Sequence, residues 1–144
     1  MIGKFDSEHN FLSNFSPSPI IVNGLKCPTV EHAYQIYRTK PEAGQDREDI
    51  LALPPGKAKK KAHLVPQNPT FERRKVAIMR QALQKKFSIP ELRTKLLATG
   101  EETLVEGNWW HDNFWGDCHC PKCFNTEGQN MLGKLLMELR EKLA

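Results

Sequence analysis

Apolar side chains recur at helical spacing in two stretches of the second half of this chain. In the first stretch, intervals of three and four residues place four side chains on one helix face: Val76, Met79, Leu83 and Phe87. Asn68 suits the N-cap of that helix and Pro69 its first position. The second stretch is a stripe near the C-terminus: Leu132, Leu135, Leu136, Leu139 and Leu143. The pattern predicts two amphipathic helices, each docked by its apolar face on a core.

Three shorter helices are predicted from their start and stop residues. Thr29 is a suitable N-cap for the first of them. The second begins near Asp46 and stops at the two prolines at 54–55, because proline removes a backbone donor. The third has the spacing of a capping box at 88–91, and Gly100 is placed to end it.

The chain contains few strand signals. The β-branched run Ile20–Val22 and the residues Leu25–Cys27 flank Asn23 and Gly24, a dipeptide favoured in two-residue hairpin turns. Thr103–Val105 has the composition of a further short strand. The length of 144 residues is close to the commonest size of a single domain. We therefore expect a mainly α fold, one compact helical domain over residues 1–144 with a small β-hairpin or short strands.

Charge and hydropathy indicate the partners and the cellular location of the protein rather than its fold. The net charge of +4 favours phosphate-bearing partners without requiring a nucleic-acid polymer. The basic clusters at 57–61 and 73–75 fit either a solvated helix face or the steering of phosphate. No apolar run approaches the roughly 20 residues that cross a bilayer, and the N-terminus lacks the pattern of a signal peptide. We expect a cytoplasmic protein without membrane contact; the sequence gives no oligomeric state.

Glu31, Gln35 and Arg38 form a polar row on the helix predicted after Thr29, because each residue turns a helix by about 100°. A carboxylate and an amide one turn apart can hold a substrate hydroxyl or a water molecule. A surface helix with a solvated face has the same pattern. The row is therefore a candidate site with two interpretations.

A second candidate is the segment 105–116, in which four aromatic side chains lie within seven residues: Trp109, Trp110, Phe114 and Trp115. The same segment offers Glu106, His111 and Asp112. Aromatic rings beside acidic groups suit a pocket that stacks a flat base and stabilises positive charge on a sugar. Burial as a local hydrophobic lid is the competing interpretation.

Three of the four cysteines lie within six residues: Cys118, Cys120 and Cys123. This spacing is poor for a disulfide framework and suits reduced thiols or a metal. The two-residue gap between Cys120 and Cys123 is that of a zinc knuckle. A fourth ligand is missing locally; Cys27 or His111 supplies it only if folding brings one of them close, and adjacent His119 would need an awkward geometry. A tight loop of reduced cysteines and a structural zinc site both fit.

The residues 128–133 open the last predicted helix with two glycines. The backbone N–H groups of such a start can bind a phosphate, although similar starts are common without a ligand. Catalytic triads, Walker loops and dinucleotide fingerprints are absent from the sequence.

Short motifs follow one another in a specific order along nearly the whole chain. They are Phe11-Leu12-Ser13-Asn14-Phe15, Pro28–Gln35, Lys86-Phe87, Thr99-Gly100, Leu104–Glu106, Asp112, Trp115-Gly116, Gly128–Gly133, Leu136-Met137 and Arg140. Each motif alone is modest, but the ordered series resembles the NADAR, or YbiA-like, family.

This resemblance implies a mainly helical single domain with N-glycosidase activity on riboflavin-pathway intermediates that carry a phosphorylated ribosylamino group. Other members of the family are associated with NAD or ADP-ribose chemistry, including removal of ADP-ribose from guanine in DNA. We therefore expect a small phosphorylated ribosyl or nucleotide substrate, with ADP-ribosylated DNA as a further candidate. We expect the reaction to need no cofactor.

The motif match also implies which residues form the site. They are Asn14, Glu31, His32 and Gln35 in the first half, and Asp112, Trp115 and Asn130 in the second. Cleavage of a ribosyl C–N bond builds positive charge at the anomeric carbon, and Glu31 and Asp112 are predicted to stabilise it, activate water or help the departing nitrogen. Trp115 is predicted to stack the heterocycle, and the asparagines, Gln35 and His32 to bind substrate.

Two departures from the family pattern matter. Many relatives have a lysine seven residues after the motif glutamate, where this chain has Arg38, and an arginine cannot act as an amine nucleophile. If the family reaction proceeds through a lysine Schiff base, either Lys40 takes that role or the mechanism here differs. Arg38 is instead predicted to pair with phosphate. Phe71 replaces the tryptophan usual near the start of the central helix.

A different class of function also fits these residues. A non-catalytic module that binds ADP-ribose or a nucleotide, stabilised by zinc and acting on modified nucleic acid, would use the basic clusters and the cysteine-rich segment.

Overall fold

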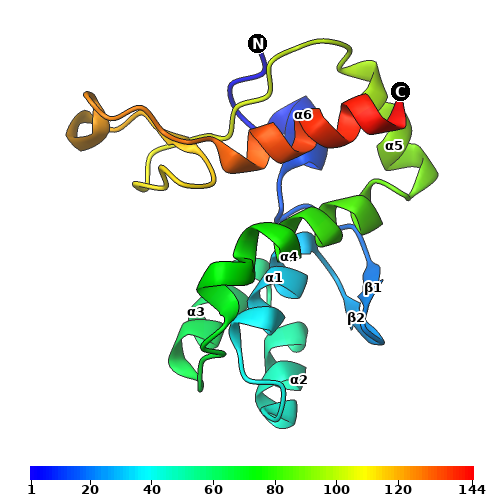
Figure 1. Cartoon of the computed structure of the whole chain (residues 1–144), viewed down its shortest axis with the longest axis vertical. Coiled ribbons are helices and arrows are strands. Elements are labelled where there is room, and N and C mark those ends of the chain that lie inside the picture. Colours follow the sequence, from blue (N-terminus) through cyan, green and yellow to red (C-terminus); the bar gives the residue numbers. More distant parts are fainter. The chain divides into compact units, whose positions relative to one another are not determined.

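The computed structural model describes all 144 residues, and the prediction of a mainly α fold is confirmed. The chain forms six α-helices, two short 3-10 helices and four short strands. Its backbone divides into two compact units, one of residues 14–89 and one of residues 1–13 with 90–144 (Figure 1). None of the helices combines the length and apolar character that crossing a membrane requires.

The unit of residues 14–89 consists of one hairpin and four helices. Its elements are β1 (Ile20–Val22), β2 (Leu25–Cys27), α1 (Val30–Arg38), α2 (Gly44–Ala52), α3 (Pro55–Leu64) and α4 (Phe71–Lys86). Helix α1 packs against α3 and α4, α2 packs against α3, and β1 lies against α4 (Figure 1). Helix α1 is thus the central element of this unit.

The predicted hairpin is confirmed. Strands β1 and β2 pair antiparallel with Val22 opposite Leu25, which leaves Asn23 and Gly24 as the two turn residues. Their φ angles of 48° and 81° are in the left-handed region, which glycine and asparagine adopt more readily than other residues.

Helix α3 is an element that the sequence patterns did not predict. Pro55 is its first residue, a position where the missing N–H does no harm. Ala58 and Ala62 are buried together with Ile36 and Ile50. The lysines between these alanines are exposed or half-buried, so the basic cluster is the solvated face of a helix whose apolar face is made of small residues.

Helix α4 begins at Phe71, two residues after the predicted start. The Asn68 side chain accepts hydrogen bonds from the backbone N–H and the hydroxyl of Thr70, at 3.0 and 2.9 Å. This local turn replaces the predicted N-cap, because an asparagine side chain that binds two residues ahead favours a turn over a helix. The buried face of α4 includes Met79 and Leu83, as predicted.

The unit of residues 1–13 and 90–144 contains η1 (Ser7–Leu12), α5 (Pro90–Ala98), β3 (Gly107–Asn108), β4 (Asp117–Cys118), η2 (Pro121–Cys123) and α6 (Met131–Leu143). Helix α5 packs against η1 and α6. Figure 1 shows the long segment between α5 and α6 extending beyond the N-terminal end of α6. Four leucines of the predicted stripe on α6 are buried: Leu132, Leu135, Leu136 and Leu139.

Two predictions around α5 fail for local reasons. The Ser88 hydroxyl donates to the carbonyl of Lys85 at 2.6 Å, so it closes the end of α4 rather than forming a capping box. Residues 103–105 form no strand; Leu104 makes a single bridge to Ile2. The position of Gly100 just after α5, with a φ of 62°, agrees with the prediction.

Candidate functional site

The polar row on α1 is a chain of side-chain hydrogen bonds. The Gln35 amide donates to Oε1 of Glu31 at 2.9 Å, and the Arg38 Nε donates to Oε1 of Gln35 at 2.9 Å. Glu31 is 6% exposed and Gln35 1%. The interpretation of this row as a solvated surface is therefore wrong; the helix carries a buried acid whose hydrogen bonds are set by its own neighbours.

Burial dominates the electrostatics of Glu31. Desolvation raises the pKa of its carboxyl group, and the hydrogen bond from Gln35 with the nearby charges of Lys59 and Arg38 only partly opposes this. A carboxyl group with a raised pKa keeps its proton at a higher pH than an exposed glutamate does. Such a group can donate a proton to a leaving nitrogen.

Asn14 lies directly beside the start of α1. Its backbone carbonyl accepts a hydrogen bond from the N–H of Glu31 at 3.1 Å, and its Nδ2 faces the sulfur of Met79 at 3.6 Å. The Oδ1 of Asn14 is buried and has no hydrogen-bond partner. A buried acceptor without a donor is unfavourable, and a hydroxyl or N–H group of a ligand would satisfy it.

His32 holds the start of α1 in place. Its Nε2 lies 2.7 Å from the carbonyl of Leu53, and its Nδ1 lies 2.8 Å from the hydroxyl of Thr29. Because a carbonyl only accepts, Nε2 carries the proton. The Thr29 oxygen also accepts from the backbone N–H of His32 at 3.2 Å, which confirms Thr29 as the N-cap. Both ring nitrogens of His32 are thus engaged inside the protein.

Arg38 and Phe71 are in contact. The Arg38 guanidinium carbon lies 4.6 Å from the centre of the Phe71 ring, a stacked arrangement that keeps the planar group in one orientation. Phe71 also contacts Tyr34 edge-on, with ring centres 5.0 Å apart. Lys40 follows α1 by two residues and is exposed.

Lys86 is a buried amine that the sequence patterns did not mark as chemically notable. It has no exposed surface; its Nζ donates to the Ser16 hydroxyl at 3.1 Å and lies 5.1 Å from the centre of the Phe87 ring. Burial lowers the pKa of this lysine to about 7. The sequence offered two signals: Lys86 belongs to the ordered motif series, and it lies seven residues after Met79 on the apolar face of α4.

In the other unit, Asp112 organises the tryptophan-rich loop. Its Oδ1 accepts from the backbone N–H groups of Phe114 and Trp115, at 3.1 and 2.9 Å. The rings of Phe114 and Trp115 meet edge-on at 4.9 Å. Sequence reasoning missed Asn108, which is 1% exposed and whose Nδ2 donates to the carbonyl of Asp112 at 2.8 Å. Asp112 and Trp115 therefore belong to one ordered turn.

Asn130 fixes the residues 104–106 against the start of α6. Its Oδ1 accepts from the N–H of Glu106 at 3.0 Å, and its Nδ2 donates to the carbonyl of Leu104 at 2.9 Å. Its amide is thus occupied at both ends.

The interpretation of the start of α6 as a phosphate site is wrong, because protein groups already occupy its donors. The first two N–H groups of α6, those of Met131 and Leu132, donate to the carbonyls of Phe114 and Trp115 at 3.0 Å each. A helix start whose donors are bound to protein carbonyls does not offer them to an anion.

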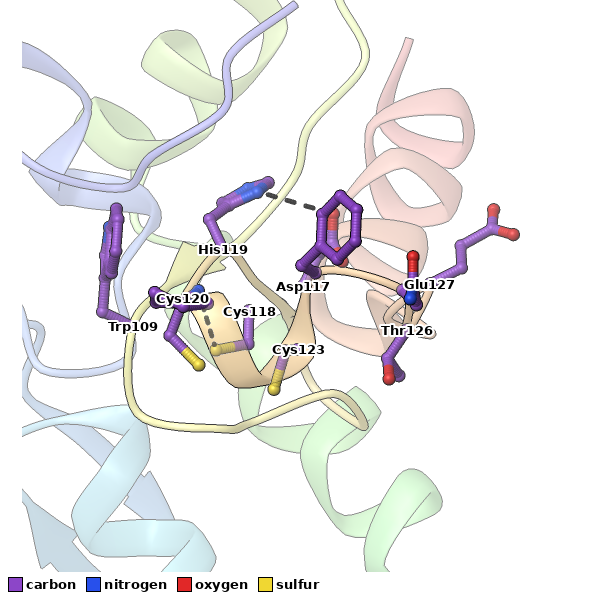
Figure 2. A pocket seen from close by; sticks show the side chains of 11 residues that line it. Trp109, Asp117, Cys118, His119, Cys120, Cys123, Thr126 and Glu127 are labelled. Carbon is purple, nitrogen blue, oxygen red and sulfur yellow. Dashed lines mark hydrogen bonds and ion pairs between the residues drawn. The ribbon is translucent and has the colours of Figure 1, made fainter.

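The cysteine-rich segment brings the three predicted thiols together with His111. The His111 Nδ1 lies 3.2 Å from the sulfur of Cys120, 3.4 Å from that of Cys123 and 4.0 Å from that of Cys118. The segment borders a shallow hollow of about 810 Å³ (Figure 2). These four residues are one group with metal-ligand chemistry.

Comparisons with known proteins identify the family of this chain. A profile of the NADAR domain matches residues 2–144. The N-glycosidase YbiA of Escherichia coli (strain K12) is 39% identical over 145 residues, which cover 95% of this chain and 83% of that protein. The riboflavin biosynthesis protein PYRR, chloroplastic, of Zea mays is 36% identical, with 91% of this chain and 23% of that protein covered. The NMR structure of the E. coli protein YbiA superposes with a TM-score of 0.80 at 35% identity, over 99% of this chain and 86% of that one.

These relatives place the chain among the N-glycosidases, which are hydrolases of N-glycosyl bonds. Within that class, the chain belongs to the NADAR domain family, as its motifs indicated.

Proposed function

We propose that this protein hydrolyses the C–N glycosidic bond of a phosphorylated ribosylamino-pyrimidine, an intermediate of riboflavin biosynthesis, or of a related ADP-ribosyl compound. The observation that carries the proposal is the buried row of Glu31, Gln35 and Arg38 on α1. The names of the relatives from E. coli and maize support the bond type and the pathway.

Glu31 acts in this proposal as the general acid. Breaking a ribosyl C–N bond leaves electrons on nitrogen and positive charge on the anomeric carbon. A carboxyl group whose pKa is raised by burial delivers its proton to that nitrogen and then carries a negative charge beside the sugar cation. Gln35 keeps the carboxyl group oriented through both states.

The remaining residues bind and orient the substrate. Arg38 pairs with the phosphate, because its Nε is fixed on Gln35 while the two Nη groups form a fork suited to phosphate oxygens. Asn14 offers its unsatisfied Oδ1 to a sugar hydroxyl. For Asp112 and Trp115, the motif match alone supports the roles of second carboxylate and stacking ring. His32 and Asn130 act as positioning residues, because the protein itself occupies their polar atoms.

We infer a direct attack by water rather than a lysine Schiff base. Arg38 occupies the position of the family lysine and cannot form an imine, and Lys40 lies exposed beyond the end of α1. Incubation with substrate and borohydride tests this point. A protein that gains the mass of the reduced sugar adduct would refute direct attack, and unchanged protein mass during turnover supports it.

The alternative is a non-catalytic module that binds ADP-ribose or a nucleotide on modified nucleic acid. The group of three cysteines and His111, which could hold a stabilising metal ion, supports this alternative. Incubation of the protein with the phosphorylated ribosylamino-pyrimidine and, separately, with an ADP-ribosylated DNA oligonucleotide distinguishes the two functions. Release of free base and ribose 5-phosphate, or of ADP-ribose, followed by mass spectrometry, supports the hydrolase. Saturable binding with no product over many hours supports the module.

A further inference from the structure

Four potential metal ligands converge in the tryptophan-rich half of the chain. The Nδ1 of His111 and the sulfur atoms of Cys118, Cys120 and Cys123 all lie within 4.8 Å of one another. The three cysteines are 3%, 6% and 9% exposed and form a buried cluster of their own. The group therefore has one imidazole and three thiols turned toward a common centre.

The separations fit tetrahedral coordination of zinc. Zinc bonds of about 2.3 Å to sulfur and about 2.0–2.1 Å to nitrogen give ligand separations of about 3.6 Å for N–S pairs and 3.8 Å for S–S pairs. The distances from His111 Nδ1 to the three sulfurs are 3.2, 3.4 and 4.0 Å. Because all four ligand atoms lie within 4.8 Å of one another, binding an ion would change no ligand separation by more than about 1 Å.

Polar groups around the cluster donate hydrogen bonds to two of the three sulfur atoms. The backbone N–H groups of His111 and Cys120 donate to the sulfur of Cys118 at 3.3 and 3.5 Å. The Asn113 amide donates to the sulfur of Cys123 at 3.4 Å and accepts from the N–H of Cys118 at 2.9 Å. Donors around sulfur lower the free energy of the thiolate and orient the ligands.

The backbone conformation of His111 is also consistent with a metal ligand. His111 has a φ of 68°, a left-handed conformation that is uncommon for residues other than glycine. This conformation places Nδ1 beside all three sulfurs. An unfavourable backbone conformation persists where other interactions hold it, and a bond from Nδ1 to an ion would be such an interaction.

The other candidate ligands lie elsewhere. The Nε2 of His119 lies 3.9 Å from a carboxylate oxygen of Asp117, and Figure 2 shows this ring turned toward Asp117 rather than toward the sulfurs. Cys27 donates to the carbonyl of Leu25 at 3.6 Å inside the hairpin, and burial raises the pKa of its thiol to about 11. Only His111 completes the set of four.

We propose that His111, Cys118, Cys120 and Cys123 bind one zinc ion as a closed structural site. Soft thiolate ligands in a tetrahedral set with one imidazole favour zinc over magnesium, calcium or manganese. Binding requires three thiols to lose their protons, so the bound site has three thiolates, one neutral imidazole and a net charge of −1. Four protein ligands leave no position for water. The ion ties His111, which precedes Asp112 and Trp115 in the chain, to β4 and η2, which follow them.

The test is the zinc content of the purified full-length protein, measured by inductively coupled plasma mass spectrometry after growth with zinc. We expect about one zinc per chain in the wild type and near-complete loss in Cys120→Ser and in His111→Ala. His119→Ala is the matched control and is expected to keep the metal, because that ring faces Asp117.

Tryptophan fluorescence supplies a second readout that does not depend on variants. All three tryptophans of the protein lie between residues 109 and 115, so their emission reports on this loop alone. Chelation of the wild type is expected to shift the emission to longer wavelength, and added zinc to restore it at one equivalent per chain, with helical circular dichroism unchanged. Wild-type protein that contains no zinc and takes up none with its thiols reduced would overturn the proposal, as would equal loss of metal in His119→Ala.

Discussion

The amine of Lys86 is buried on the apolar face of α4. Its lowered pKa predicts that the stability of the protein depends on pH. Burial lowers that pKa to about 7 from an ordinary value of 10.5. Between pH 7 and 10.5 the unfolded chain therefore holds a proton that the folded protein has lost, so stability rises with pH in this window. From pH 7 to pH 9 the contribution of Lys86 amounts to about 2 kcal/mol.

Urea unfolding at pH 7 and pH 9 measures this contribution. Wild type and the exposed-site control Lys85→Met are expected to gain stability over this interval by about 2 kcal/mol more than Lys86→Met does. Equal gains for all three proteins would show that the amine titrates in the folded state as it does in water.

At the scale of residues, sequence reasoning identified side chains by type and motif but not their surroundings. Glu31 and Gln35 were predicted as a site, yet only the packing of α1 between other helices shows that they are buried. His32 was assigned to the substrate because the motif includes it, whereas its nitrogens bind Thr29 and Leu53. Leu53 lies 21 residues away, a contact that no local pattern reveals.

Helix α6 depends on a glycine at its third residue. A Cβ atom on Gly133 would lie 2.1 Å from the carbonyl oxygen of Leu104 and 2.4 Å from the Asn130 amide. Gly133→Ala is expected to reduce the free energy of unfolding by about 1–3 kcal/mol despite the better helix propensity of alanine. The clash displaces Asn130, which holds Leu104 and Glu106.

Gly44→Ala is the matched control for this prediction. Gly44 is the first residue of α2, and a Cβ atom there meets nothing within 4 Å. Chemical denaturation is expected to find Gly44→Ala as stable as the wild type or slightly more stable. Equal stability of Gly133→Ala and Gly44→Ala would contradict the close packing at α6.

At the scale of elements, the sequence predicted segments with a strong apolar period or with clear turn and capping residues. The hairpin, the capped start of α1 and the leucine stripe of α6 each have a local cause. Helix α3 was not predicted because Ala58 and Ala62 give its apolar face little hydrophobic contrast with the lysines. Strands β3 and β4 pair Gly107 with Asp117 in parallel, and a two-residue pairing that depends on a loop closing has no local signature.

At the scale of the whole molecule, the order of motifs was more informative than any single pattern. Family membership and the class of reaction followed from that order, and the comparisons confirmed them. The proposed metal-ligand set was only partly predictable from sequence. The spacing of Cys120 and Cys123 is that of a zinc knuckle, but the choice of His111 over Cys27 and His119 required the fold.

The central claim is that the buried carboxyl group of Glu31 performs the chemistry, and the loss of turnover in Glu31→Gln tests it most directly. Burial raises the pKa of Glu31, so the folded state holds a proton that the unfolded state has released. The stability that this proton contributes is therefore lost as the pH rises from the usual pKa of a glutamate through the raised pKa of Glu31. The neutral isostere is expected to fold at least as stably as the wild type at pH 7. Glu91→Gln, at an exposed position of α5, serves as the control.

With the phosphorylated ribosylamino-pyrimidine as substrate and free base followed by mass spectrometry, kcat/KM is expected to fall at least about 100-fold in Glu31→Gln and to stay unchanged in Glu91→Gln. Hydrolysis by Glu31→Gln at the wild-type rate, in protein shown to be folded, would contradict the account.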